Sequence, residues 1–298
     1  MTTDYTKTKL DISHRGLIRL PSDLHLYTEL KELNCSLNNL TDLDDLPPTL
    51  EVLDCRGNSL ASLDHLPATL QVLMCDHNFI ESLDHLPATL EELSCGYNDI
   101  VSLDQLPVTL KRLVCCSNVL SSLNSLPPGL LYLKCRNNEI SFLDHLPPTL
   151  LELDCECNGI TVLDELPNSL SILVCPHNDL TALDQLPPKL LKLNCNFNEI
   201  TSFRHLPDSL LVLQCQYNRL TALNHLPPHL LELYCGSNYI TSLDPLPDSL
   251  LVLQCEHNKL TSLDPLPPAL KLLDCNQNKD IHLDHLPISL KYLDSCIS

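Results

Sequence analysis

The 298-residue sequence has no tryptophan, only six glycines and four phenylalanines, and 18 basic residues against 38 acidic ones. Six glycines without insertions leave no phosphate-cradling loop and no long loop in which an active site is usually built. A formal charge of −20 argues against nucleic acid or an anionic membrane as the main partner. Composition therefore argues against a loop-built active site and against nucleic acid or an anionic membrane as the main partner.

Long apolar runs are also lacking. No segment approaches the roughly 18 to 20 apolar residues of a membrane helix. The opening segment, MTTDYTKTKL, is polar and shows no secretory signal. We therefore expect the protein in the cytoplasm, either of its own cell or of a host cell, while export without a conventional signal stays open.

The chain does contain a strict twenty-residue period. Thirteen cysteines recur from Cys35 to Cys275, each followed three places later by an asparagine. The repeats read L-x-x-L-x-C-x-x-N-x-[LI]-x-x-L-x-x-L-P-x-x, with Phe203 and Asp280 as the two exceptions. Positions are numbered here from the leucine that opens each repeat, beginning with Leu30. A fixed period of this length indicates a solenoid built from one stacked unit per repeat.

One repeat, residues 50–69, shows what each turn has to do. Positions 1, 4 and 6 alternate inward, which predicts a short strand from Glu51 to Cys55. Asn58 follows at a bend, where its amide group is able to pair with backbone groups of neighbouring turns. Pro67 fixes an extended conformation, and too few residues remain for a helix. We expect a mainly β coil with a parallel concave sheet of about 14 short strands and an extended, polyproline-like convex side.

We expect a single solenoid over residues 10–298, preceded by a polar tail at 1–9. It comprises an irregular first turn at 10–29, thirteen repeats at 30–289 and a terminal strand at 290–298. Nothing resembling a capping helix follows that strand. Self-association into a homodimer through this uncapped C-terminal edge is therefore an open alternative.

The column of cysteines is predicted to pack in the core as small hydrophobic residues. Stacked in-register thiols lie about 4.7–4.9 Å apart, wider than the roughly 3.8 Å between the Cβ atoms of a disulfide. Only Cys116, Cys157 and Cys296 leave the column, and these three thiols are expected to be accessible. The rival interpretation is a metal or redox protein that uses the cysteine column, and thiol titration of the native protein separates the two.

These repeats resemble the leucine-rich repeat superfamily in its short, twenty-residue form. That form is known from bacterial effector proteins, and similar cysteine-bearing versions occur in giant viruses. The resemblance covers about residues 10 to 295, with cysteine in place of the usual aliphatic residue of the strand. It implies a right-handed coil with a parallel concave sheet, used to bind other proteins.

Positions 3, 5, 7 and 8 should face out of the concave sheet, and they vary while the inward columns do not. One candidate protein-binding cluster is basic. It comprises Arg112, Tyr132, Lys134 and Arg136, beside Lys111. It suits an acidic segment of a partner. The competing interpretation is ordinary solvated charge, since Glu152 and Asp154 follow on the next turn.

A second candidate cluster is aromatic. It comprises Phe197, Tyr217, Tyr234 and Tyr239, next to a leucine stripe at 191, 211, 231 and 251. Such residues are typical interface anchors. The alternative is that the aromatic side chains only cover half-buried leucines. Met74, Phe79 and Tyr97 form a weaker third cluster.

Six histidines share one convex column, from His65 to His285, but Gln, Ser, Glu and Pro also occur in it, unlike a set of metal ligands. We therefore predict no catalytic, cofactor or metal site. The favoured function is a non-enzymatic scaffold that binds partner proteins through the concave face. The alternatives are the thiol-rich metal or redox protein and a self-assembling structural protein.

Overall fold

The structure is a computed structural model that describes residues 4–243, 245–279, 281, 283 and 285–294. The chain divides into two compact units, residues 1–150 and 151–298. Each unit is a parallel β-solenoid, and each is described by itself.

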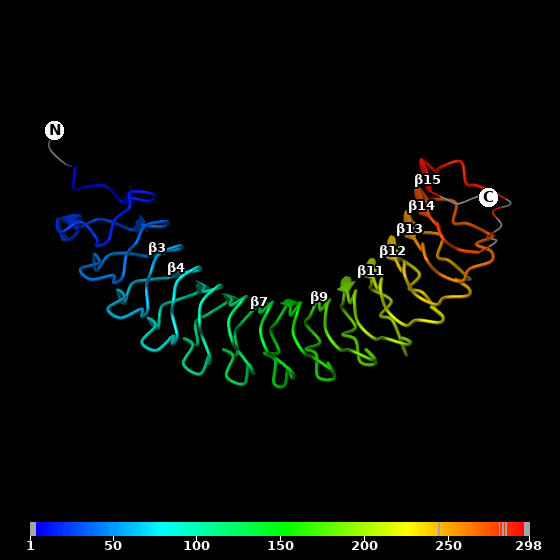
Figure 1. Cartoon of the computed structure of the whole chain (residues 1–298), viewed down its shortest axis with the longest axis horizontal. Coiled ribbons are helices and arrows are strands. Elements are labelled where there is room, and N and C mark those ends of the chain that lie inside the picture. Colours follow the sequence, from blue (N-terminus) through cyan, green and yellow to red (C-terminus); the bar gives the residue numbers. More distant parts are fainter. Residues whose placement is uncertain (1–3, 244, 280, 282, 284, 295–298) are drawn as a thin grey trace. The chain divides into compact units, whose positions relative to one another are not determined.

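Every repeat contributes one three-residue strand. Unit 1 contains β1 (Lys9–Asp11), β2 (Glu32–Asn34), β3 (Val52–Asp54), β4 (Val72–Met74), β5 (Glu92–Ser94), β6 (Arg112–Val114) and β7 (Tyr132–Lys134). Unit 2 contains β8 (Glu152–Asp154), β9 (Ile172–Val174), β10 (Lys192–Asn194), β11 (Val212–Gln214), β12 (Glu232–Tyr234), β13 (Val252–Gln254), β14 (Leu272–Asp274) and β15 (Tyr292–Asp294). Within each unit the strands pair in chain order and line the concave side of the coil (Figure 1).

The register confirms the period read from the sequence. Leu33 pairs with Leu53 and Leu213 with Leu233, a step of twenty residues. The first pairing is different, because Leu10 lies beside Leu33 after a turn that is three residues longer. That turn contains η1 (Leu24–Leu26), a single turn of 3-10 helix and the only helix among the described residues. The expectation of a mainly β coil is confirmed.

The strands differ from expectation in number and length. The described residues contain fifteen strands, one more than expected, since β1 lies at the boundary between the expected tail and the first turn. Each strand is three residues long where five were predicted from Glu51 to Cys55. The ladder nevertheless extends beyond β3, because Glu51 N–H donates to Lys31 O and Cys55 N–H to Met74 O, both at 2.8 Å.

The core of each unit consists of leucine columns and one column of cysteines, as predicted. Positions 1 and 4 are fully or almost fully buried from Leu30 to Leu273, and the thirteen column cysteines are at most 1% exposed. Several thiols donate to the carbonyl of position 5 in the next turn, as Cys55 Sγ does to Met74 O at 3.4 Å. The thiol therefore both fills the core and bonds to the neighbouring strand.

A ladder of buried asparagines joins successive turns behind the strands. Asn198 Nδ2 donates to Cys175 O at 3.0 Å and Cys195 O at 3.1 Å, and its Oδ1 accepts the backbone N–H of Leu180 at 3.0 Å. The same three bonds recur in repeat after repeat. Backbone groups at the bend of one turn are thus satisfied by a side chain of another, as the sequence suggested.

The convex side is held by turns and hydroxyl groups. Each Leu-Pro pair opens a tight turn in which the proline carbonyl accepts from the next opening leucine, as Pro67 O does from Leu70 N–H at 3.1 Å. A hydroxyl at position 20 then joins adjacent turns, since Thr69 Oγ1 lies 2.7 Å from Leu50 O. Ser209, Ser249 and Ser289 make the same bond in unit 2.

None of the helical structure in the described residues is long and apolar enough to cross a lipid bilayer. The last four residues, 295–298, which include part of the expected terminal strand, lie outside the described residues.

We predict that Asn198→Ala destabilises unit 2 by about 1–3 kcal/mol, because it leaves the buried Leu180 N–H without its acceptor. It also removes one of the two asparagine donors from each of the Cys175 and Cys195 carbonyls. Hydrogen exchange should show loss of protection at the Leu180 amide. Asn224→Ala, on the exposed convex side, is the control and should change stability little. Equal effects of the two variants would contradict this account of the ladder.

Candidate protein-binding surface

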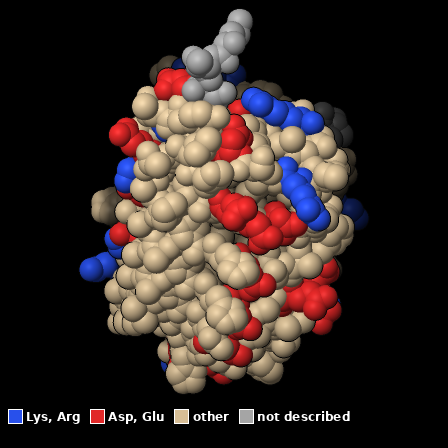
Figure 2. Space-filling view, turned by 90° about the vertical axis from the view of Figure 1, so that its left-hand side faces the viewer, with Lys and Arg blue, Asp and Glu red and all other residues tan. Residues whose placement is uncertain are grey.

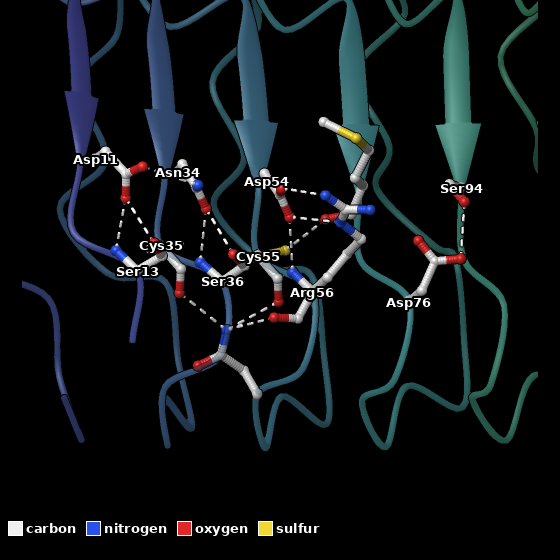
Figure 3. A network of polar contacts seen from close by, with 12 residues as sticks. Asp11, Ser13, Asn34, Cys35, Ser36, Asp54, Cys55, Arg56, Asp76 and Ser94 are labelled. Atoms are coloured by element: carbon white, nitrogen blue, oxygen red, sulfur yellow. Dashed lines mark hydrogen bonds and ion pairs between the residues drawn. The ribbon is translucent and has the colours of Figure 1, made fainter. Parts of the chain in front are cut away.

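Several strands end in a small polar turn at the edge of the concave surface. An Asp or Asn at position 5 accepts the backbone N–H of position 7, as Asp11 does from Ser13 at 2.9 Å and Asn34 from Ser36 at 3.0 Å (Figure 3). Where position 5 is Ser94, the preceding turn supplies the acceptor instead, and Asp76 bonds Gly96 N–H at 3.0 Å. These bonds fix the backbone at the edge of the concave surface.

Position 8 has a left-handed backbone in every repeat from Leu37 to Gln277. The φ angle of its non-glycine residues lies between 52° and 57°, although only Gly57 has the residue type that favours this region. The N–H of position 8 donates to the position 7 carbonyl of the next turn, as in Phe197 N–H to Gln216 O at 3.0 Å. The column is therefore rigid, and its side chains lie in register one above another.

The basic cluster comes together on β6 and β7 of unit 1. Arg112 and Tyr132 are direct partners in the register, and the Arg112 guanidinium lies 4.3 Å from the centre of the Tyr132 ring. Lys134 ends β7, and Arg136 follows it at position 7. Neighbouring acidic groups reduce its charge, since Lys111 pairs with Glu91 at 2.7 Å and Arg112 with Glu92 at 4.0 Å. The residues of the basic cluster do lie on adjacent turns, but neighbouring carboxylates partly neutralise their positive charge.

The aromatic cluster is only partly assembled. Phe197 and Tyr217, both at position 8, stack with ring centres 4.2 Å apart and planes 8° apart. His177 extends the stack, with its ring 4.3 Å from that of Phe197. The sequence analysis did not include His177, although its position in the same column as two aromatic residues was a usable signal. Phe197 is 41% and Tyr217 51% exposed, so the stack faces solvent.

Tyr234 and Tyr239 belong to other columns of the repeat. Tyr234 ends β12 at position 5 and donates its hydroxyl to Glu232 Oε2 at 2.9 Å. Burial and that hydrogen bond raise the pKa of Tyr234 to about 12. Tyr239 lies at position 10, where Lys259 Nζ lies 5.1 Å from the centre of its ring. The four aromatic residues thus occupy three columns, because only residues at the same position of their repeats lie next to one another along the coil.

Apolar side chains also reach the concave surface. The leucine stripe of unit 2 is half-buried, except for Leu191, which is exposed. In unit 1 a shallow hollow lies over β1 to β4, with Val52 and Met74 among its lining residues and Lys9 and Glu32 paired at its margin. Of the third cluster, Phe79 and Tyr97 are exposed, and Tyr97 stacks on His77 at 4.2 Å.

Charge on the N-terminal end is mixed but mainly acidic in its centre. Acidic side chains gather in a band down the middle of the view, with basic side chains beside it (Figure 2). Some of these charges are paired, as Arg56 is with Asp54 at 2.6 Å. A partner on this surface thus meets alternating charges rather than one uniform field.

The described residues contain no cluster of three or more His, Cys, Asp or Glu side chains placed to hold a metal ion. In the convex histidine column, His65 lies 3.8 Å from Asp44 and His85 3.9 Å from Asp64, as exposed pairs. The fifteen cysteines in the described part of the chain are not in disulfides, and Cys116 and Cys157 are half-buried. Cys296, the third thiol expected to be accessible, lies outside the described residues.

Burial keeps the column thiols protonated. It raises the pKa of Cys35 to about 12 and raises that of fully buried Cys195 and Cys235 further. Since the thiolate is the form that binds metals and attacks disulfides, this environment disfavours the metal or redox interpretation.

Solved structures of similar proteins show where this architecture belongs. YopM from Yersinia enterocolitica is 31% identical with a TM-score of 0.75, over 97% of this chain and 78% of YopM. This chain belongs to the leucine-rich repeat family. YopM from Yersinia pestis, described as a leucine-rich effector protein, is 28% identical, with a TM-score of 0.67 and coverage of 97% and 88%.

A further leucine-rich repeat protein shares the cysteine feature. The functional domain of InlJ from Listeria monocytogenes, which includes a cysteine ladder, is 28% identical with a TM-score of 0.75, over 98% of this chain and 68% of that one. No protein-family model and no curated protein sequence matches the chain.

We predict that the protein loses stability as the pH rises through about 9. The unfolded chain releases its thiol protons near pH 8.5–9, while the buried thiols of the folded protein keep theirs. High pH therefore stabilises the unfolded state relative to the folded state, and the free energy of unfolding falls. Each buried thiol contributes up to about 1.4 kcal/mol per pH unit. Thermal melting under reducing conditions at about pH 7.5 and about pH 10 measures the effect.

The matched control replaces Cys175, Cys195 and Cys215 by valine, which keeps a small apolar side chain, one methyl group larger, and removes three titrating groups. Its melting temperature should fall less between the two pH values. An equal fall in both proteins would show that the cysteine column is not the cause.

Proposed function

We propose that this leucine-rich repeat protein is a non-enzymatic scaffold that binds partner proteins through its concave face and the adjoining column at position 8. One observation carries the proposal: the inward positions repeat almost without change, while positions 3, 5, 7 and 8 differ from turn to turn. A rigid frame that presents unlike side chains in register suits recognition.

The two candidate clusters supply different contacts within this scheme. Arg112, Tyr132, Lys134 and Arg136 in unit 1 suit an acidic segment, and the stack around Phe197 and Tyr217 in unit 2 suits an apolar or planar group. Rings held by a fixed backbone lose little conformational entropy on binding. Protein partners are therefore favoured over nucleic acid or membrane, given the net charge of −20.

A cytoplasmic location, including the cytoplasm of a host cell, is part of the proposal. It is supported by the free thiols, which suit a reducing compartment, and by similarity to a protein described as an effector.

Affinity purification from cell lysate followed by measured affinities for the recovered partner tests the scaffold. The double variants Tyr217→Ala/Tyr234→Ala and Arg112→Glu/Arg136→Glu should each be compared with wild type, with exposed, convex Phe142→Ala as the control. We expect at least one double variant to weaken binding by roughly tenfold or more, and the control by little. Undiminished binding by both double variants would show that another surface binds the partner.

Self-association through the last strand is a second candidate. The described residues next to β15 expose apolar side chains, since Leu286 is 48% and Ile288 fully exposed. A second copy that covers this end would remove them from water. Sedimentation over a range of concentrations should then show a dimer that Ile288→Lys weakens, and a monomer at every concentration would exclude the idea.

A further inference from the structure

The stack of rings at position 8 in unit 2 is interrupted one turn after Tyr217. The column continues with Ser237 and then His257, so a residue with no ring lies between two residues with rings. His177, Phe197 and Tyr217 show that the column accepts one ring per turn, at centre-to-centre distances of 4.3 and 4.2 Å. Position 7 of the same turn is Gly236, which has no side chain. We call the space over Gly236 and Ser237 the notch.

The spacing of the turns leaves room in the notch for one planar group. Two strand spacings separate Tyr217 from His257 along the coil, which is roughly 9–10 Å. A planar group in contact with a ring on each side needs about 7–8 Å. The walls are held by the backbone, because Tyr217 N–H donates to Gly236 O at 3.1 Å and Ser237 N–H to Glu256 O at 2.8 Å.

A carboxylate already lies in the notch. A Cβ atom added to Gly236 would lie 2.0 Å from Glu256 Oε1, so the Glu256 side chain covers this glycine. Its Oε1 accepts from Gln216 Nε2 at a long 3.3 Å. Its Oε2 is buried and finds no hydrogen-bond donor among the described residues. A buried carboxylate oxygen without a donor is costly, and a cationic donor would relieve that cost.

We propose that the notch binds an arginine side chain of a partner protein, an inference that rests on the scaffold function proposed above. A guanidinium group is planar, so it fits between the Tyr217 and His257 rings. It is also a cation with several N–H donors, so it satisfies Glu256 once the carboxylate turns towards it. Lysine is not planar, and Tyr and Trp offer a single neutral donor, whereas the guanidinium combines a permanent charge, a planar face and five N–H donors.

The chain itself contains the same contact elsewhere. On adjacent turns of unit 1 the Arg112 guanidinium lies 4.3 Å from the centre of the Tyr132 ring. The spacing between turns is therefore compatible with a guanidinium stacked on a tyrosine. In unit 1 the corresponding step beyond Tyr97 leads to Ser117 and then to Asn137, which carries no ring, so the two walls are not repeated there. That step supplies a matched control.

The first test uses a short glycine peptide with one central arginine, together with otherwise identical lysine and citrulline peptides. Titration is followed by the NMR signals of the Tyr217 and His257 rings. We expect saturable shifts with the arginine peptide and several-fold weaker binding of lysine, because an ammonium group has no planar face to stack between two rings and fewer donors for the carboxylate. The neutral, isosteric citrulline should bind least. Equal responses to all three peptides, or none to arginine, would overturn the proposal.

Two variants localise the site. Ser237→Phe fills the missing ring position, which Phe197 and Tyr217 show the backbone accepts, and should abolish the shifts. Ser117→Phe places the same residue in unit 1 and should leave them unchanged. Glu256→Gln should weaken arginine binding by roughly tenfold, with little effect on citrulline. Retained binding in Ser237→Phe would exclude the notch.

The notch and the scaffold fail in different ways. If wild type and Ser237→Phe bind a recovered protein partner equally well, the scaffold stands and the notch has no part in it. If the arginine peptide binds at the notch but wild type and Ser237→Phe both recover no protein partner, the notch recognises a guanidinium group, but its role in binding a partner protein fails together with the scaffold.

Discussion

The buried asparagine ladder is the constraint on which the rest of each unit depends. A chain that reverses direction behind a three-residue strand leaves N–H and C=O groups inside, away from water. Asn118, like its equivalents, bonds to two cysteine carbonyls and accepts a leucine or isoleucine N–H from the turn before. No turn is complete alone, because its partners lie one repeat away. This dependence holds successive turns in register, including the first turn, which is three residues longer.

Register, in turn, determines which outward side chains are neighbours. Side chains at the same position of adjacent turns become neighbours, whatever their chemistry. Arg112 meets Tyr132, Arg219 meets Glu199 at 2.6 Å, and His77 meets Tyr97. The scaffold does not select these contacts. The scaffold places unlike residues side by side at the same position of adjacent turns. The chemistry of each pair then determines whether the two side chains form a salt bridge, stack as rings or leave a space.

The columns of the core could be predicted because periodicity reports burial directly. Leu213 and Cys215 are inward for the same reason as their counterparts in each repeat, and the cysteine and asparagine roles followed from position alone. The aromatic cluster was harder. Tyr234 and Tyr239 are close to Tyr217 in sequence but belong to other rows, whereas His177 is forty residues from Tyr217 and lies in the same stack. The left-handed backbone at position 8 carries no glycine signal, so neither its rigidity nor the stacking of its rings was evident from residue types.

The hydroxyl bonds of the convex side follow a period of their own. In residues 151–298 serine at position 20 ties adjacent turns at Ser209, Ser249 and Ser289, while Lys189, His229 and Ala269 have no hydroxyl to offer at the junctions between them. On the convex side of this unit, hydroxyl bonds therefore join adjacent turns at every second junction. The pattern of these side-chain bonds therefore repeats every two turns, or forty residues, whereas the backbone bonds repeat at every turn.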